Sequence, residues 1–237
     1  MTGQNRRAVR FRQNHGRAAV WLHTPSPWGA PASVEPTTLT LRGDPMTIAT
    51  APVLADLVPA HRVRDAALVV SATALLAVAG QLAVPLPFTP VPLSLATFAV
   101  VLSGAALGPA RAAAATVLYL ALGLAGAPLF ADGNAGWAFA SFGYVLGFVP
   151  AAMLVGWGAR RRSDRRVPSM LLAAAAGSAV IYLIGTTWLM AFLGVGLREG
   201  LAMGVLPFLA GDAIKVAAAA LLLPSAWATI NAFRPEE

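Results

Sequence analysis

The sequence predicts an all-α integral membrane protein with six transmembrane helices. Of its 237 residues, 57% are hydrophobic and only 11% are charged, whereas an ordinary soluble domain has about 25% charged residues. From Ala66 onward, apolar stretches alternate with short polar breaks. A helix of about 17–25 residues spans the hydrocarbon core of a bilayer. Because backbone groups inside lipid must bond within their own segment, we expect these stretches to be helices.

Six stretches fit this pattern. They cover residues 66–84, 93–107, 112–129, 137–157, 169–193 and 201–223. The second is short and flanked by prolines, so its limits are the least defined. With a cytoplasmic N-terminus, the inner loops hold Arg62, Arg64, Arg111, the five arginines of residues 160–166 and Arg234, whereas the outer loops hold Arg198 alone. Since basic loops stay in the cytoplasm, we expect both termini there.

Composition excludes several classes of function. The chain has no cysteine, which excludes disulfides, thiolate zinc sites and cysteine nucleophiles. Its histidines, His15, His23 and His61, all precede the apolar region, so the hydrophobic body has no imidazole for metal binding or general base catalysis. The net charge of +7 resides mainly in the N-terminal segment and in one loop between apolar segments. This distribution favours a membrane protein over a nucleic-acid-binding one.

The chain divides into three parts. Residues 1–60 are predicted to be a disordered basic N-terminal extension, because their first 45 residues show no sustained helical or strand periodicity. No apolar segment follows their arginines as it would in a signal peptide. One hypothesis is that translation begins at Met46, which the intact mass of the native protein would test. Residues 61–230 form the six-helix membrane domain, and residues 231–237 form a cytoplasmic tail.

One pair of charges stands inside the last predicted span. Asp212 and Lys215 are three residues apart and therefore share one helix face. Charges at membrane depth are costly and usually face a bundle interior or a water-filled cavity. The pair either neutralises itself to fix helix packing or recognises a polar ligand. Pro207 and Gly211 favour the second interpretation, because they permit a broken helix whose backbone lines a cavity.

Two outer loops carry further candidate ligand contacts. Residues 84–92 contain four prolines, which favour an extended, polyproline-like course. This loop is either a stiff connector or a lid with Phe88 available for stacking. Residues 127–137 form a polar turn bracketed by aromatic side chains. Its Asn134 offers hydrogen-bond donors and an acceptor, although an interfacial turn with aromatic residues such as Trp137 needs no ligand.

Small residues four apart are candidates for close helix packing. They include Gly104 with Gly108 and Gly143 with Gly147. The arginines of residues 160–166 are interpreted as a determinant of topology.

Several short motifs occur together in a fixed order. They are Thr89-Pro90-Val91-Pro92, Leu107-Gly108-Pro109-Ala110-Arg111, Gly126-Ala127-Pro128-Leu129-Phe130, Gly143-Tyr144 and Gly211-Asp212-Ala213-Ile214-Lys215. With the six spans, this series resembles the BioY family, the biotin-specific substrate-binding (S) components of energy-coupling-factor (ECF) transporters. The resemblance covers the chain from Ala66 to Pro224.

The resemblance implies a six-helix S component in the bacterial plasma membrane that captures biotin from outside. Biotin would be the transported substrate, and no cofactor is implied. The partners would be a transmembrane T component and two cytoplasmic ATPases, so this chain would be a transporter subunit and not an enzyme. The absence of a Walker A motif agrees with ATP being used by other chains.

The resemblance also implies roles for individual residues. Asp212 and Lys215 would hold the polar parts of biotin, with the choice between its ureido group and its carboxylate left open. Asn134 matches a ligand-contacting asparagine in the loop between the third and fourth helices. Gly143-Tyr144 matches the end of a Thr/Ser-Gly-Gly-Tyr motif that borders the site.

Other residues are expected to form the pocket walls or to contact the T component. The aromatic side chains that we expect in the walls are Phe88, Phe130, Trp137 and Tyr144. Ala67 and Ser71 stand where the family has an Ala-x-x-x-Ala contact with the T component. The chain has Phe142 in place of one motif glycine, and Ala96 where the family tends to have glutamine.

Three other functions remain open. The same architecture would suit an S component for another vitamin. An intramembrane enzyme is disfavoured because no nucleophile and base are paired in the apolar region. A structural membrane subunit without a ligand is the third alternative.

Overall fold

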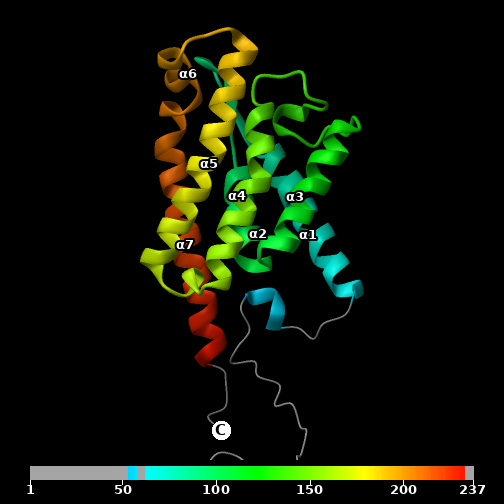
Figure 1. Cartoon of the computed structure of the whole chain (residues 1–237), viewed down its shortest axis with the longest axis vertical. Coiled ribbons are helices and arrows are strands. Elements are labelled where there is room, and N and C mark those ends of the chain that lie inside the picture. The colour runs from blue at the N-terminus through cyan, green and yellow to red at the C-terminus, as the bar shows by residue number, and fades with distance from the viewer. Residues whose placement is uncertain (1–52, 58–61, 233–237) are drawn as a thin grey trace, which may run out of the picture. The chain divides into compact units, whose positions relative to one another are not determined.

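A computed structural model of the chain describes residues 53–57 and 62–232. In chain order the elements are η2 (Leu54–Leu57), α1 (Arg62–Gln81), β1 (Ala83–Leu86), β2 (Thr89–Ser94), α2 (Ala96–Leu107), α3 (Pro109–Leu124), η3 (Ala131–Gly133), α4 (Phe142–Arg160), η4 (Ser163–Arg165), α5 (Val167–Leu193), α6 (Leu197–Gly204), η5 (Leu206–Phe208) and α7 (Leu209–Ala232), where η marks a 3₁₀-helix (Figure 1). The predicted helical fold is confirmed for this part of the chain.

Four helical segments of the described residues are long and apolar enough to cross a membrane. They are Val63–Gln81, Phe142–Arg160, Val167–Leu193 and Leu197–Ala232. The shorter apolar helices α2 and α3 have 12 and 16 residues, about 18 and 24 Å at 1.5 Å per residue. Both are shorter than the hydrocarbon core of about 30 Å. The second and third predicted spans are therefore helical over less than their predicted length.

The proline-rich loop pairs with itself, which corrects the all-α prediction. β1 and β2 form an antiparallel two-stranded sheet in which Val84 pairs with Leu93 and Leu86 with Thr89. The backbone is extended as predicted, but it forms a hairpin and not a polyproline connector. The amide nitrogens of alternate residues in a strand point to the same edge. Pro90 and Pro92 are two residues apart, so their nitrogens share one edge of β2. Proline is tolerated at a strand edge that needs no N–H donor.

The last predicted span, residues 201–223, is broken at Pro207, whereas Gly211, the other residue expected to permit a break, lies inside α7. α6 ends at Gly204, and Val205 leaves the helical conformation with φ −126° and ψ −58°. The short η5 follows, and α7 begins at Leu209. The break places Asp212 in the first turn of α7.

α4 packs against α2, α3 and α5, and small residues let these helices approach closely. A Cβ atom on Gly147 would lie 3.0 Å from the Cα of Ile181 in α5, and one on Gly104 would lie 2.8 Å from the Ala152 carbonyl oxygen. A side chain at either position would push the helices apart. Of the predicted small pairs, Gly143 and Gly147 both face α5, where Gly143 contacts Trp188.

Residues 53–57 also belong to the packed structure. Val53 is fully buried, and Asp56 of η2 accepts a hydrogen bond from Arg111 at 2.7 Å. Arg111 also lies 3.2 Å from Asp65 of α1. The ordered structure thus includes residues from the segment predicted to be a disordered extension. The remainder of that extension, the Met46 start and the tail beyond Ala232 lie outside the described residues.

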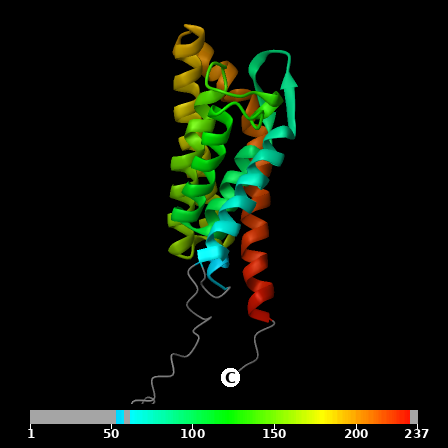
Figure 2. The same cartoon turned by 90° about the vertical axis from the view of Figure 1, so that its right-hand side faces the viewer.

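α1 begins and α7 ends at the same end of the bundle, and the α4–α5 loop lies at that end too (Figures 1 and 2). The β1–β2 hairpin, the α3–α4 loop and α6 lie at the opposite end. The fold therefore brings the proline-rich loop and the start of α7 to one end of the molecule.

Candidate functional site

A cavity opens between the hairpin and the helices that surround it. It is lined by β2, the first turn of α2, the loop after α3, and residues of α3, α4, α5, η5 and α7. Segments distant in the sequence therefore converge on one pocket.

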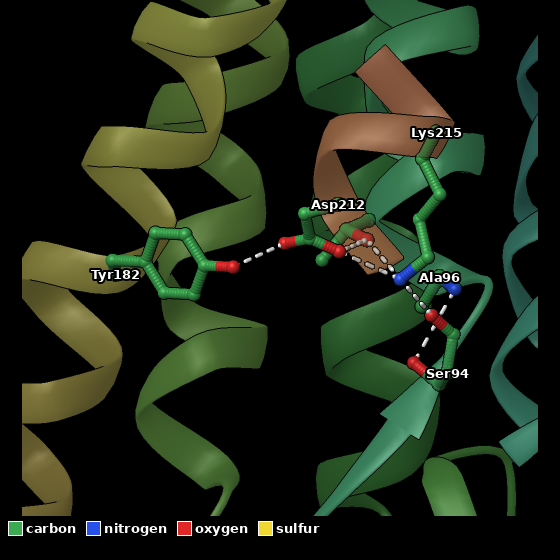
Figure 3. A network of polar contacts seen from close by, with 6 residues as sticks. Ser94, Ala96, Tyr182, Asp212 and Lys215 are labelled. Atoms are coloured by element: carbon green, nitrogen blue, oxygen red, sulfur yellow. Dashed lines mark hydrogen bonds and ion pairs between the residues drawn. The ribbon is translucent and has the colours of Figure 1, made fainter. Parts of the chain in front are cut away.

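Asp212 and Lys215 both line this cavity. Lys215 Nζ lies 2.7 Å from Asp212 Oδ1, and the side chains of the two residues are only 12% and 10% exposed. The hydroxyl of Tyr182, from α5, donates to Asp212 Oδ2 at 2.6 Å (Figure 3). The two carboxylate oxygens thus have different partners, one cationic and one neutral.

Lys215 is held by three acceptors. Besides Asp212, its ammonium group donates to the Ser94 carbonyl oxygen at 2.6 Å and to Thr97 Oγ1 at 3.1 Å. An ammonium group has three N–H donors, and all three therefore have partners. Thr97 lies 3.4 Å from Asp212 Oδ1 and is close enough to donate to it. The network joins the end of β2, the start of α2, α5 and α7, as Figure 3 shows.

Phe130 and Tyr144 are part of the apolar wall. Phe130 is fully buried and meets Tyr119 edge-on, with ring centroids 5.3 Å apart. Gly123 contacts its ring and leaves room for it. The Tyr144 hydroxyl donates to the Gly204 carbonyl oxygen of α6 at 2.7 Å. Both rings line the cavity, while the Tyr144 hydroxyl ties α4 to α6.

The other candidate residues lie elsewhere. Phe88 and Trp137 are 63% and 62% exposed and do not line the cavity. Asn134 donates to the Ala131 carbonyl oxygen at 2.8 Å, and Ala131 lines the cavity although Asn134 does not. Asn134 therefore holds the loop that closes one side of the pocket.

The structure also locates the residues that differ from the family motifs and the two α1 residues expected to contact the T component. Ala96 lines the cavity beside Thr97. Phe142 packs edge-on against Trp188, with ring centroids 5.3 Å apart. Ala67 and Ser71 are exposed on α1, one helical turn apart.

Sequence reasoning missed the residues that hold the charged pair, namely Tyr182, Thr97 and the Ser94 carbonyl. The sequence did carry a signal for Tyr182, because the chain has only three tyrosines. All three, Tyr119, Tyr144 and Tyr182, line this cavity. Hydroxyl-bearing aromatic rings in apolar spans usually have a hydrogen-bond partner. Among the described residues no group of three or more histidine, cysteine, aspartate or glutamate side chains is placed to hold a metal ion.

The family model described as the BioY family matches residues 47–232, which is most of the chain and includes the whole cavity. The chain belongs to the BioY family. Within the family, it is 35% identical over 164 residues to the "Probable biotin transporter BioY" of Pyrococcus horikoshii, covering 68% of this chain and 94% of the relative. It is 32% identical over 151 residues to the "Biotin transporter BioY2" of Lactococcus lactis, covering 62% of this chain and 81% of the relative.

The fold of this BioY-family chain matches a solved structure as well. The S-component for biotin from an ECF-type ABC transporter superposes with a TM-score of 0.63 at 24% sequence identity, over 69% of this chain and 90% of the other. The bundle therefore has the ECF S-component fold.

Proposed function

We propose that this chain captures biotin from outside the cell as the S component of an ATP-driven ECF importer. The observation that carries the proposal is the cavity in which a buried Asp212–Lys215–Tyr182 network lies among aromatic walls. Biotin combines a polar ureido group, an apolar ring body and a carboxylate. A few directed polar groups in a mostly apolar pocket suit such a molecule.

The network also suggests which end of biotin it holds. Asp212 and Lys215 already neutralise each other, so a neutral ureido group adds no net charge to the buried pair, whereas a carboxylate would. Asp212 Oδ2 accepts one bond from Tyr182 and has lone-pair capacity for a second donor. We assign the ureido N–H to Asp212 and the carboxylate to the mouth of the cavity.

Substitution of the charged pair tests the site. Asp212→Asn and Lys215→Ala are each expected to weaken biotin binding at least tenfold, about 1.4 kcal/mol, because each leaves a buried charge without its partner. Titration calorimetry on purified protein measures the affinity. Asp132→Asn is the matched control, since Asp132 is an exposed acid in the α3–α4 loop. Unchanged affinity in both site variants would remove the assignment.

The substrate itself is tested with a panel of radiolabelled vitamins offered to the purified protein. We expect retention of biotin alone. Retention of another vitamin in its place would favour an S component of different specificity, and retention of none would favour a structural subunit.

The proposal includes partners and a location. We infer that the chain crosses the bacterial plasma membrane six times with both termini in the cytoplasm. It would pair with a T component through the exposed α1 face that carries Ala67 and Ser71. The partner ATPases would hydrolyse ATP, since the sequence has no Walker A motif. Co-purification of the tagged chain with those subunits would support this arrangement.

A further inference from the structure

The loop between α4 and α5 presents positive charge at the end of the bundle where α7 ends (Figure 1). Of the five arginines in residues 160–166, which are the last residue of α4 and the loop itself, four are exposed and Arg165 is half-buried. The one acid within residues 160–166, Asp164, is fully buried and accepts a hydrogen bond from Trp227 Nε1 of α7. Burial raises the pKa of Asp164 above its usual range. The outward-facing charges of this loop are therefore all positive.

Two tryptophans hold arginines of this loop in place. The guanidinium carbon of Arg161 lies 3.4 Å from the centroid of the Trp157 ring, and that of Arg165 lies 3.9 Å from the centroid of the Trp227 ring. Stacking of this kind is a cation–π interaction. At Arg161 the interaction occupies the face of the guanidinium and leaves its in-plane N–H donors for an anion beside it.

An apolar strip on α4 continues directly from the arginines. Met153, Leu154 and Trp157 are 47%, 37% and 50% exposed. Arg161 follows Met153 by eight residues, about 12 Å along a helix axis. Half of a hydrocarbon core is about 15 Å thick, so the stretch from Arg161 to Met153 covers most of the depth of one leaflet.

We propose that the α4–α5 loop and the Met153–Leu154–Trp157 strip bind an anionic phospholipid. The phosphate of the lipid lies against Arg161, Arg162 and Arg166, and an acyl chain lies along the strip. An acidic protein surface would satisfy the arginines alone, whereas a phospholipid satisfies both the charges and the apolar side chains beside them. Basic side chains at a membrane surface attract anionic lipids in this way. This surface lies apart from the cavity and does not depend on which substrate the chain binds.

Native mass spectrometry of the purified protein in mixed micelles tests the proposal. With equal phosphatidylglycerol and phosphatidylcholine, we expect the wild type to retain phosphatidylglycerol preferentially. The triple variant Arg161→Gln, Arg162→Gln, Arg166→Gln is expected to lose at least tenfold in apparent phosphatidylglycerol affinity. Arg198→Gln is the matched control, because this exposed arginine lies on α6 at the other end of the bundle. Elution as a single symmetric peak in size-exclusion chromatography reports whether each variant is folded, independently of its substrate.

Fluorescence quenching locates the lipid. Phosphatidylglycerol with brominated acyl chains should quench the tryptophan fluorescence of the protein more strongly than brominated phosphatidylcholine at the same content, and Trp157→Phe should remove that difference.

Equal retention of the two lipids, or unchanged retention by the triple variant, would overturn the proposal. Displacement of the lipid by millimolar inorganic phosphate would show a simple anion site in its place, and would also overturn it.

Discussion

Asp212 divides its hydrogen bonds between a cation and a hydroxyl. Oδ1 accepts from Lys215, with Thr97 close by, and Oδ2 accepts from Tyr182. Each partner comes from a different part of the chain, so the carboxylate is fixed in rotation as well as in place. Fixed polar groups bind a ligand without a further ordering cost.

Removal of the Tyr182 hydroxyl tests this role. A hydrogen bond to a charged group contributes about 1.5–3 kcal/mol, so Tyr182→Phe is expected to lower biotin affinity about tenfold by releasing Asp212 Oδ2. Calorimetry at neutral pH measures the change.

Tyr119→Phe is the matched control for that variant. Tyr119 also lines the cavity, but its hydroxyl donates to the Leu129 carbonyl oxygen at 3.1 Å and does not reach Asp212. Its loss should change the affinity less than about threefold. Equal losses in the two variants would show that Tyr182 contributes only wall packing.

Among the elements, the hairpin and α6 are joined by a hydrogen bond. Thr89 Oγ1, in β2, donates to the Met203 carbonyl oxygen at 2.8 Å and accepts a bond from the Val91 amide at 3.2 Å. The strand beyond it, from Val91 to Ser94, lines the cavity. The bond therefore holds one wall of the pocket against α6.

Thr89→Val keeps the β-branched shape and removes this bond. Because a net hydrogen bond contributes about 0.5–1.5 kcal/mol, biotin should dissociate about two- to tenfold faster, with little change in its association rate. A chase of radiolabelled biotin with unlabelled biotin measures both rates. Thr187→Val is the control, since Thr187 bonds within its own helix, to Leu183. If Thr89→Val releases biotin at the wild-type rate, the Thr89–Met203 hydrogen bond does not hold the hairpin in place.

Hydropathy predicted the long helices but not where the short ones begin. The predicted span 93–107 starts on Leu93 and Ser94, which the structure assigns to β2, because Leu93 pairs with Val84 and Ser94 with Ala83 across the hairpin. A run of apolar residues has the same hydropathy in a strand as in a helix, so composition alone does not separate them. Pairing with β1 therefore determined that these residues form a strand and not the start of a helix.

The sequence predicted only part of the candidate site, because composition marks unusual residues but not which side chains meet. Asp212 and Lys215 stood out because charge is rare in an apolar span. Phe88 and Trp137 stand in loops, and loop side chains have no periodicity that shows which way they point. Tyr182 lies 30 residues before Asp212, and their contact depends on how α5 packs beside α7.

For the whole molecule, the distribution of basic residues supports the proposed orientation. Arg64, Arg111 and the α4–α5 loop lie at the end where α1 begins and α7 ends, whereas Arg198 lies on α6 at the other end. Basic residues are retained on the cytoplasmic side. The cavity would then open toward the outside, where biotin is captured.

Introduced cysteines test this orientation without background, because the chain has none of its own. Ala135→Cys, in the α3–α4 loop, should react with a membrane-impermeant maleimide in intact cells. Asn231→Cys, at the end of α7, should react only after the cells are permeabilised. Both positions are exposed, so full reaction of each after permeabilisation is the control. The reverse pattern in intact cells would contradict the proposed topology.

The contacts of η2 limit how far the chain can be shortened. Val53 is buried, and Asp56 gives Arg111 one of its two carboxylate partners. A version trimmed to begin at the first residue of α1 would uncover the apolar surface that Val53 covers and leave Arg111 with Asp65 alone. Preparations of the isolated bundle should therefore keep the residues from Val53 onward.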